Sequence, residues 1–165
     1  ERGYPDLEID GDVFGGRAHA LDIKVARRSA SLNQTQSRIT LYTGNTYFRY
    51  PTLEWPGTFR AFEDYESHLV LVAIYTFDPE SLSHIQDVEL VVEESWRIAS
   101  KQRSSTTREY IGAVKSIDDL KSGNGEFESA DAFYKFWRSF NFRIGRAVQQ
   151  QLDKLLAEQR SAGQS

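Results

Sequence analysis

The N-terminal part of the chain alternates between apolar and polar residues with the period of a β-strand. Over residues 4–10, Leu7 and Ile9 fall on one side and three carboxylates on the other, Asp6, Glu8 and Asp10. This alternation predicts a half-buried strand. A glycine-rich turn at residues 10–16 then returns the chain, so we expect a hairpin with residues 17–27 as its second arm.

The second arm also has a period of two. One face carries the aliphatic residues Leu21, Ile23 and Val25, and the other carries Ala20, Asp22 and Lys24. Because alternate residues of a strand share a face, Asp22 and Lys24 are expected to lie side by side. The aliphatic row is expected to be buried behind them.

The middle of the chain predicts further strands. Residues 69–77 are almost wholly apolar, which predicts a central strand covered on both faces. Strands are also expected at residues 37–43 and 88–98, a helical turn at 63–68, a loop rich in proline and glycine at 46–60, and a polar loop at 99–110.

The C-terminal part predicts helices. Apolar residues recur every three or four positions and predict one long helix that begins after an N-cap at Ser129: Phe133, Trp137, Phe140, Ile144, Val148, Leu152 and Leu155. A short helix is expected at residues 117–121, capped by Ser116 and ended near Gly123. The tail at 161–165 is expected to fray.

Composition narrows the class of protein. A length of 165 residues with 39% hydrophobic residues predicts one globular domain over residues 1–160. The net charge of −4 excludes a generally cationic nucleic-acid binder but allows a local basic surface. The chain has no cysteine, which excludes thiol catalysis and thiolate zinc sites. It starts at Glu1 and has no methionine, so we expect that an N-terminal helical segment is missing through processing or truncation.

The candidate chemistry lies in the hairpin. Asp22 follows Asp6 by 16 residues with a turn between them, so two carboxylates and Lys24 are expected to meet. Such a group suits a metal-dependent phosphodiesterase, in which carboxylates hold Mg²⁺ and a lysine contacts the attacking water. The triplet alone is weak, because Asp119-Leu120-Lys121 repeats it on a predicted surface helix. From the triplet and its spacing alone, a solvated strand face with a cross-strand charge pair is the favoured explanation.

Several co-linear blocks add to this pattern: Tyr4-Pro5-Asp6, Ala20-Leu21-Asp22-Ile23-Lys24, residues 39–44 with Phe48-Arg49, Trp96-Arg97-Ile98-Ala99 and residues 125–138. In this order they resemble the EcoRV family of type II restriction endonucleases, within the PD-(D/E)XK nucleases. The resemblance implies an α/β (α+β) restriction-endonuclease-like fold. That fold has a central mixed β-sheet flanked by helices and a long C-terminal helix.

The resemblance also implies a function. It implies Mg²⁺-dependent hydrolysis of duplex DNA at a palindromic site, leaving 5′-phosphate and 3′-hydroxyl ends, with two ions possible per site. Asp6, Asp22 and the Ile23 carbonyl would be metal ligands, and Lys24 would orient the water and stabilise the transition state. The partners implied are double-stranded DNA, a second copy in a homodimer and a protective DNA methyltransferase, in a bacterial or archaeal cytoplasm.

DNA contacts are expected from a basic loop and from the N-terminus. The expected residues are Arg2, Gly3, Lys101, Arg103, Ser104, Thr106, Thr107 and Arg108. Arg108 is the candidate for base readout, since arginine forms two hydrogen bonds with guanine. Arg27, Arg28 and Arg38 are candidates for lining the DNA cleft, whereas His19 and His68 are expected to be structural.

The sequence departs from the family pattern in two ways. The family has a further acidic residue on a helix before the position of Glu1, and residues 104–109 differ from its recognition loop. Two alternatives therefore stay open. One is a nuclease for repair or structured DNA, and the other is a catalytically degenerate DNA-binding module.

Overall fold

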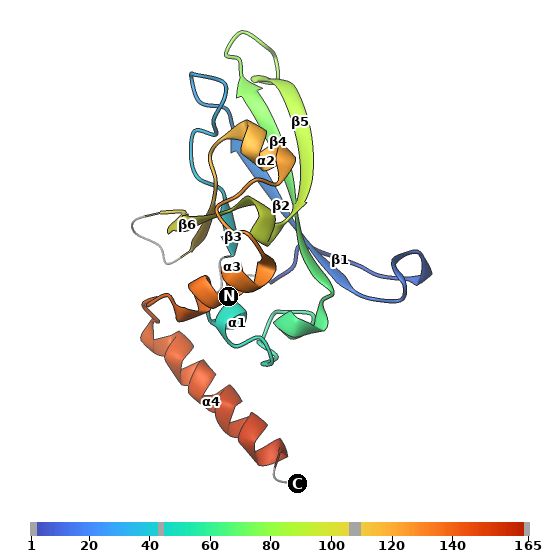
Figure 1. Cartoon of the computed structure of the whole chain (residues 1–165), viewed down its shortest axis with the longest axis vertical. Helices are drawn as coiled ribbons and strands as arrows, with labels where there is room; N and C mark the ends of the chain where they lie inside the picture. The colour runs from blue at the N-terminus through green and yellow to red at the C-terminus, as the bar shows by residue number, and fades with distance from the viewer. Residues whose placement is uncertain (1–2, 43–44, 106–109, 164–165) are drawn as a thin grey trace.

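The computed structural model describes residues 3–42, 45–105 and 110–163 (Figure 1). Its strands are β1 (Leu7–Ile9), β2 (His19–Arg27), β3 (Thr40–Tyr42), β4 (Ser67–Phe77), β5 (Ile85–Glu94), β6 (Ala99–Arg103) and β7 (Ile111–Ala113). Its α-helices are α1 (Asn45–Arg49), α2 (Ile117–Ser122), α3 (Ala130–Ser139) and α4 (Arg146–Ala162). Short 3-10 helices lie at Asp12–Phe14, Phe62–Asp64 and Ser95–Ile98.

The central sheet has the order β1-β2-β4-β5. β1 is antiparallel to β2, β2 is parallel to β4, and β4 is antiparallel to β5, so the predicted mixed sheet is confirmed. β4 is a central strand, as expected from its apolar sequence. The register pairs Asp22 with Val70 and Lys24 with Val72, which fixes the candidate residues against a buried strand.

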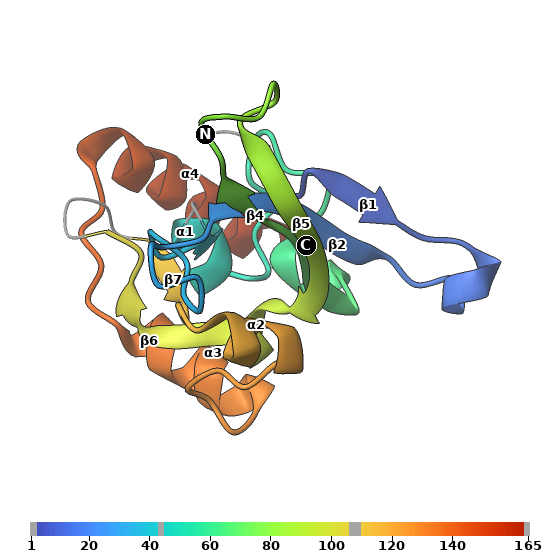
Figure 2. The ribbon, with the colours of Figure 1, turned by 90° about the horizontal axis from the view of Figure 1, so that it is seen from above.

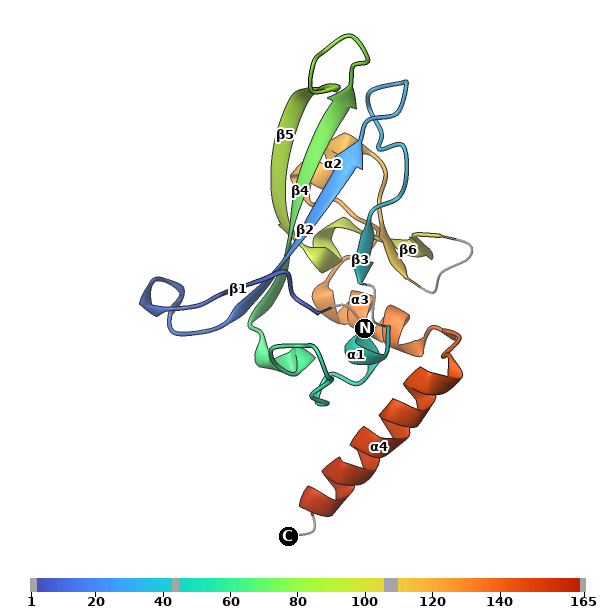
Figure 3. The ribbon, with the colours of Figure 1, turned by 180° about the vertical axis from the view of Figure 1, so that it is seen from behind.

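Only one face of this sheet is covered within the described residues. This corrects the prediction that the strand at residues 69–77 is covered on both faces, and also the prediction for the aliphatic row of β2. Val70, Val72 and Ile74 are fully buried on the inner face, but the outer face is open. Leu21, Ile23 and Val25 were expected to be the buried row of β2, yet Val25 is 68% exposed and Ile23 43% exposed. Figure 3 shows β2, β4 and β5 in front, with α2 behind them. The buried face of β2 is therefore the one that carries Asp22 and Lys24.

The two faces of the sheet are expected to respond differently to truncation. Val72→Ala removes two methyl groups from a fully buried site and should lower the free energy of unfolding by about 2 kcal/mol. Val25→Ala removes the same atoms from an exposed site and should change it by less than about 0.5 kcal/mol. Urea denaturation of both variants measures the difference. An equal loss would mean that the outer face is covered in solution.

A second sheet, with the order β3-β7-β6, lies beside the first (Figure 2). β6 and β7 form an antiparallel pair, so the polar segment 99–110 is not simply a loop as predicted. Its polar residues occupy a hairpin that β3 extends through long-range pairing with β7.

The regularly spaced apolar residues of the C-terminal part lie on two helices, α3 and α4. The prediction of one long helix was therefore wrong. The Ser129 hydroxyl caps α3 by accepting from the Ala132 N–H at 3.1 Å, as expected. The chain leaves the helix at Phe140 and begins α4 after Gly145, and the Phe142 ring between them is buried. α4 remains a long C-terminal helix. The break arises because Phe140 and Phe142 pack on Trp137, with ring centroids 5.0 and 5.7 Å from it.

Two shorter elements complete the comparison. α2 agrees with its prediction: the Ser116 hydroxyl accepts from the Asp119 N–H, and Gly123 ends the helix with a φ of 62°. Segment 46–60 is not wholly a loop, because its first residues belong to α1.

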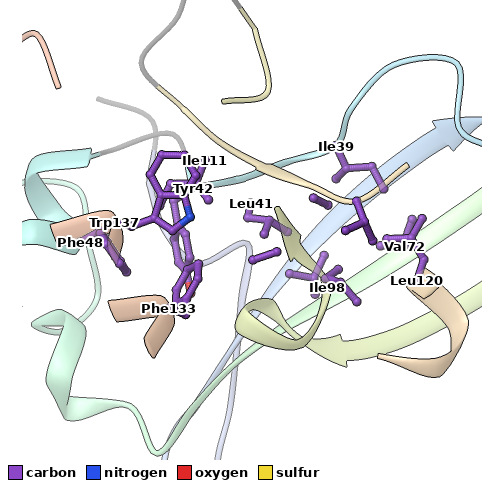
Figure 4. Packing of buried hydrophobic residues seen from close by; sticks show 14 of the residues in the cluster. Ile39, Leu41, Tyr42, Phe48, Val72, Ile98, Ile111, Leu120, Phe133 and Trp137 are labelled. Atoms are coloured by element: carbon purple, nitrogen blue, oxygen red, sulfur yellow. The ribbon is translucent and has the colours of Figure 1, made fainter. Parts of the chain in front are cut away.

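The core lies between the two sheets and the helices α1, α2 and α3 (Figure 4). Large side chains that are fully or almost fully buried fill it: Leu41, Phe48, Val72, Ile98, Ile111, Leu120, Phe133 and Trp137. Among the described residues, no helix is long and apolar enough to cross a membrane.

Candidate active site

Asp22 and Lys24 lie next to each other on the inner face of β2. Asp22 is 7% exposed, and the Lys24 Nζ is 2.6 Å from its Oδ2. The two side chains share this face because they are separated by one residue of a strand. The structure therefore holds a lysine against a buried carboxylate.

Asp6 joins them from the segment before β1. Its Oδ2 accepts a hydrogen bond from the Ile23 backbone N–H at 2.7 Å. The paired part of β1 reaches only Leu21 of β2, so the edge of β2 at Ile23 is left to Asp6. Because the N–H and C=O of one strand residue point to the same side, the Ile23 carbonyl also lies on this edge.

The two carboxyl groups have opposite pKa shifts. The Ile23 N–H holds the pKa of Asp6 below its ordinary value. The pKa of Asp22 is raised to about 6, chiefly by burial and to a smaller extent by the neighbouring Asp6, although Lys24 opposes the shift. The two groups titrate as a pair, with Asp6 ionised first and Asp22 retaining the last proton.

The donor set suits a magnesium ion. Two carboxylates and a backbone carbonyl supply hard oxygen ligands, and Mg²⁺ is held in proteins by one or two carboxylates with water in the other positions. Glu8 and Asp10, which were expected on the same strand face as Asp6, instead contact Arg60, with Glu8 at 2.7 Å. Within the described part of the chain no three acidic, histidine or cysteine side chains form a metal-holding group. A magnesium site here would therefore be formed by the carboxylates of Asp6 and Asp22 and the carbonyl of Ile23.

A buried aromatic layer lies beneath the pair of carboxylates. The Tyr4 hydroxyl is 2.8 Å from the His68 Nδ1, and the His68 Nε2 is 3.0 Å from the Phe62 carbonyl oxygen. Burial lowers the pKa of His68 to about 4. The position of His68 fits the structural role expected from the sequence. The contact with Tyr4 was not expected, because no local pattern joins residues 64 positions apart.

A solvent-open groove of about 530 Å³ begins at Lys24 and separates β2 from residues 36–40. We call it the basic groove; Lys24, Arg27, Gln36, Arg38 and Thr40 line it. No carboxylate occurs among the described residues that line it. The basic groove therefore offers positive charge beside the candidate site, and two of the three arginines proposed for a cleft lie in it.

Arg28, the third arginine proposed for the cleft, is engaged elsewhere. Its side chain forms an ion pair with Glu89 on β5, and it lines a different hollow. The short-range sequence pattern gave no means of separating Arg28 from its neighbour Arg27.

The hairpin β6–β7 is joined to the wall of the basic groove. The Arg38 guanidinium donates to the Ala113 carbonyl and to the Gln102 Oε1, both at 2.8 Å. The Thr40 hydroxyl donates to the Ser104 Oγ at 2.8 Å. Ser104 is thus a predicted DNA-binding residue that contacts the wall of the groove directly.

The other predicted DNA-binding residues are spread more widely. The Lys101 Nζ lies 5.7 Å from the Phe127 ring centre, in a separate hollow bordered by Glu126 and Glu128. Arg103 ends β6, and Gly3 is exposed near the N-terminus. Four predicted contacts lie outside the described residues: Arg2, Thr106, Thr107 and Arg108.

Comparison with known proteins identifies the family. Residues 1–158 match the family described as "Restriction endonuclease EcoRV". The chain belongs to this family. It is also 22% identical over 153 residues to the type II restriction enzyme EcoRV of Escherichia coli. That similarity covers 83% of this chain and 60% of the relative, so the chain spans less than two thirds of the relative's length.

Membership of the EcoRV family agrees with the fold and with the region that the candidate residues occupy. The match includes the central sheet, the hairpin β6–β7 and most of α4. The convergence of Asp6, Asp22 and Lys24 lies wholly within it.

Proposed function

We propose that this chain is the nuclease part of a Mg²⁺-dependent type II restriction endonuclease that cuts duplex DNA at a specific, palindromic site. The observation that carries the proposal is the meeting of Asp6, Asp22 and Lys24 at the head of the basic groove. Membership of the EcoRV family supports it. The products would carry 5′-phosphate and 3′-hydroxyl ends.

Each residue of the site has a proposed role. Asp6, Asp22 and the Ile23 carbonyl would hold one or two ions. A bound ion supplies Lewis-acid stabilisation of the phosphate oxygens and lowers the pKa of a water molecule. Lys24, already fixed by Asp22 at 2.6 Å, would orient the attacking water and stabilise the charge that develops on the phosphate.

The DNA backbone would follow the basic groove. Arg27 and Arg38 would contact phosphates on either side of the scissile bond, as arginine commonly does. The hairpin β6–β7 would reach the bases, with Arg103, Ser104, Thr106, Thr107 and Arg108 as candidate contacts. Lys101 fits this role less well, because it lies in a separate hollow bordered by Glu126 and Glu128, whose carboxylates repel phosphate. Gly3 and Arg2 remain candidates for a minor-groove contact.

The partners follow from the proposed activity. A palindromic site calls for two-fold symmetry, so we propose that the active form is a homodimer. A DNA methyltransferase in the same cytoplasm would protect the host's own copies of the site.

The test is digestion of a long duplex DNA with Mg²⁺. We expect discrete fragments whose ends ligate without enzymatic repair, because the ends are 5′-phosphate and 3′-hydroxyl. The matched control replaces Mg²⁺ by EDTA and should leave the DNA intact. Cutting confined to branched or damaged DNA would instead support a structure-specific nuclease, and binding without any cutting would support a degenerate module.

A further inference from the structure

The Tyr4 side chain packs against two hydrophobic clusters. Its ring packs against the main hydrophobic cluster and against a smaller one formed by Ala18, Ala20 and Tyr65. The Tyr42 and Tyr47 rings lie 6.0 and 5.5 Å from it. Only the buried Pro5 separates Tyr4 from Asp6, and proline limits backbone rotation at that position. A shift in the position of Tyr4 therefore also moves the backbone of Asp6.

The hydrogen bonds of His68 fix which atom carries its proton. The Phe62 carbonyl can only accept, so the His68 Nε2 donates to it at 3.0 Å. In a neutral imidazole the other nitrogen, Nδ1, then accepts, and the Tyr4 hydroxyl donates to it at 2.8 Å. The His68 ring also stacks on Phe62, with centroids 3.7 Å apart. Tyr4 is thus held by a histidine with a single defined tautomer.

His68 belongs to β4, the strand that positions Asp22. In the parallel pairing of β2 with β4, Ala20 lies opposite His68 and Asp22 lies opposite Val70. The segment carrying Asp6 is therefore tied to the same two strands at two points. Asp6 binds the Ile23 N–H of β2, and Tyr4 binds His68 of β4.

We propose that Tyr4 and His68 are positioning residues that set the distance between the carboxylates of Asp6 and Asp22 and so tune the affinity of this pair for a divalent cation. The inference rests on the proposed function, because it concerns the same two carboxylates. Neither residue touches the ion. They act as hydrogen-bonded support behind the ligands, and loss of such support commonly weakens metal binding 10-fold or more.

Tyr4→Phe and Tyr47→Phe form a matched pair for the test. Each removes one hydroxyl from the same aromatic cluster, and the Tyr47 hydroxyl donates to the Arg60 carbonyl at 2.9 Å instead of to His68. Binding of Mn²⁺ alone to the whole chain is followed through the electron paramagnetic resonance of the free ion. We expect Tyr4→Phe to weaken Mn²⁺ binding about 10-fold and Tyr47→Phe to leave it unchanged, with similar melting temperatures for the two variants.

A second pair of variants tests the direction of the hydrogen bond. His68→Asn keeps an oxygen near the position of Nδ1 that can accept from Tyr4, whereas His68→Leu has the same branching and no acceptor. Both lose the ring stack on Phe62 and the bond to its carbonyl. We expect His68→Asn to bind Mn²⁺ more tightly than His68→Leu, which a purely structural role would not produce.

The outcomes separate the two proposals. Equal Mn²⁺ affinity in Tyr4→Phe and Tyr47→Phe, with wild-type binding intact, would overturn the positioning role and leave the nuclease proposal standing. Absence of Mn²⁺ binding and of Mg²⁺-dependent cleavage in the wild-type chain would overturn both. A selective loss in Tyr4→Phe with recovery in His68→Asn supports the positioning role.

Discussion

Asp22→Asn is expected to reduce DNA cleavage by at least about 10³-fold while making the protein more stable. The amide has nearly the same shape as the carboxyl group but no charge, so it is a poor ligand for Mg²⁺. It also leaves Lys24 without the carboxylate that lies 2.6 Å from its Nζ. Loss of a single group that stabilises transition-state charge commonly lowers rates by 10²–10³, and here two functions are lost together.

The gain in stability follows from the pKa of Asp22. Burial raises it from 3.8 to about 6, which corresponds to about 3 kcal/mol against the folded state once the group is ionised. The folded state binds the extra proton between these pH values, so the stability contributed by Asp22 falls as the pH rises through this window. Above pH 6 the whole penalty is present. Asp22→Asn should therefore raise the melting temperature by about 6–12 °C at pH 8, at about 2–4 °C per kcal/mol for a chain of this size, and by little at pH 4.

Asp119→Asn is the matched control, because Asp119-Leu120-Lys121 repeats the Asp22-Ile23-Lys24 triplet on helix α2. Asp119 lies in the first turn of that helix, where a carboxylate is favourable. Its removal should leave cleavage unchanged and lower stability slightly, the opposite sign from Asp22→Asn. Single-turnover cleavage rates and calorimetric melting temperatures measure both effects. Wild-type cleavage by Asp22→Asn would remove this carboxylate from the site.

Local sequence pattern was sufficient to predict β2 and the proximity of Asp22 to Lys24. Period two fixes which residues share a face, and this part of the prediction is confirmed by the 2.6 Å contact. Hydropathy did not identify the buried face, since it favoured the row of Leu21, Ile23 and Val25. The buried face is instead the one with small residues, Ala20 and Ala26, against which other elements pack.

Elements that depend on distant partners were predicted less well. β6 is polar and β7 has only three residues. They are strands because they pair with each other and because β7 pairs with β3, about 70 residues earlier. The apolar stripe continues in phase across residues 140–145, so the sequence could not reveal the break between α3 and α4. The break depends on Phe142, which turns back to stack on Trp137.

The site itself was only partly visible in the sequence. Turn chemistry correctly brought Asp6 toward Asp22, but three features depend on tertiary structure. The first is the hydrogen bond from Tyr4 to His68, the second is the ion pair between Glu8 and Arg60, and the third is the basic groove. Each joins segments that lie far apart along the chain, and no periodicity records such contacts.

Cleavage at low Mg²⁺ concentration is expected to fall about tenfold for each pH unit below pH 6, and added Mg²⁺ should move this midpoint to lower pH. The proposed metal site needs Asp22 ionised, and its pKa is raised to about 6 chiefly by burial. A proton and a cation compete for the same carboxylate, so a higher Mg²⁺ concentration displaces the proton at a lower pH. Asp6, whose pKa is lowered by the Ile23 N–H, stays ionised through this range.

His68 makes the stability profile different from the activity profile. Burial lowers its pKa from 6.5 to about 4, so the folded state binds fewer protons there than the unfolded state. The stability contributed by neutral His68 is present above pH 6.5 and is lost as the pH falls toward 4, opposite in sign to Asp22. The two contributions largely offset each other between pH 4.5 and 6. The fold should therefore survive while cleavage declines.

Single-turnover rates from pH 4.5 to 8 at two Mg²⁺ concentrations, with circular dichroism at each pH, test this expectation. A tenfold increase in Mg²⁺ should shift the midpoint of cleavage by up to one pH unit while the spectrum stays native. A midpoint that does not respond to Mg²⁺ would mean that the titrating group is not a metal ligand. A decline in cleavage that coincides with loss of the native spectrum would assign the pH dependence to unfolding. The site stays folded while Asp22 titrates only if the opposite stability contributions of His68 and Asp22 cancel in this pH range.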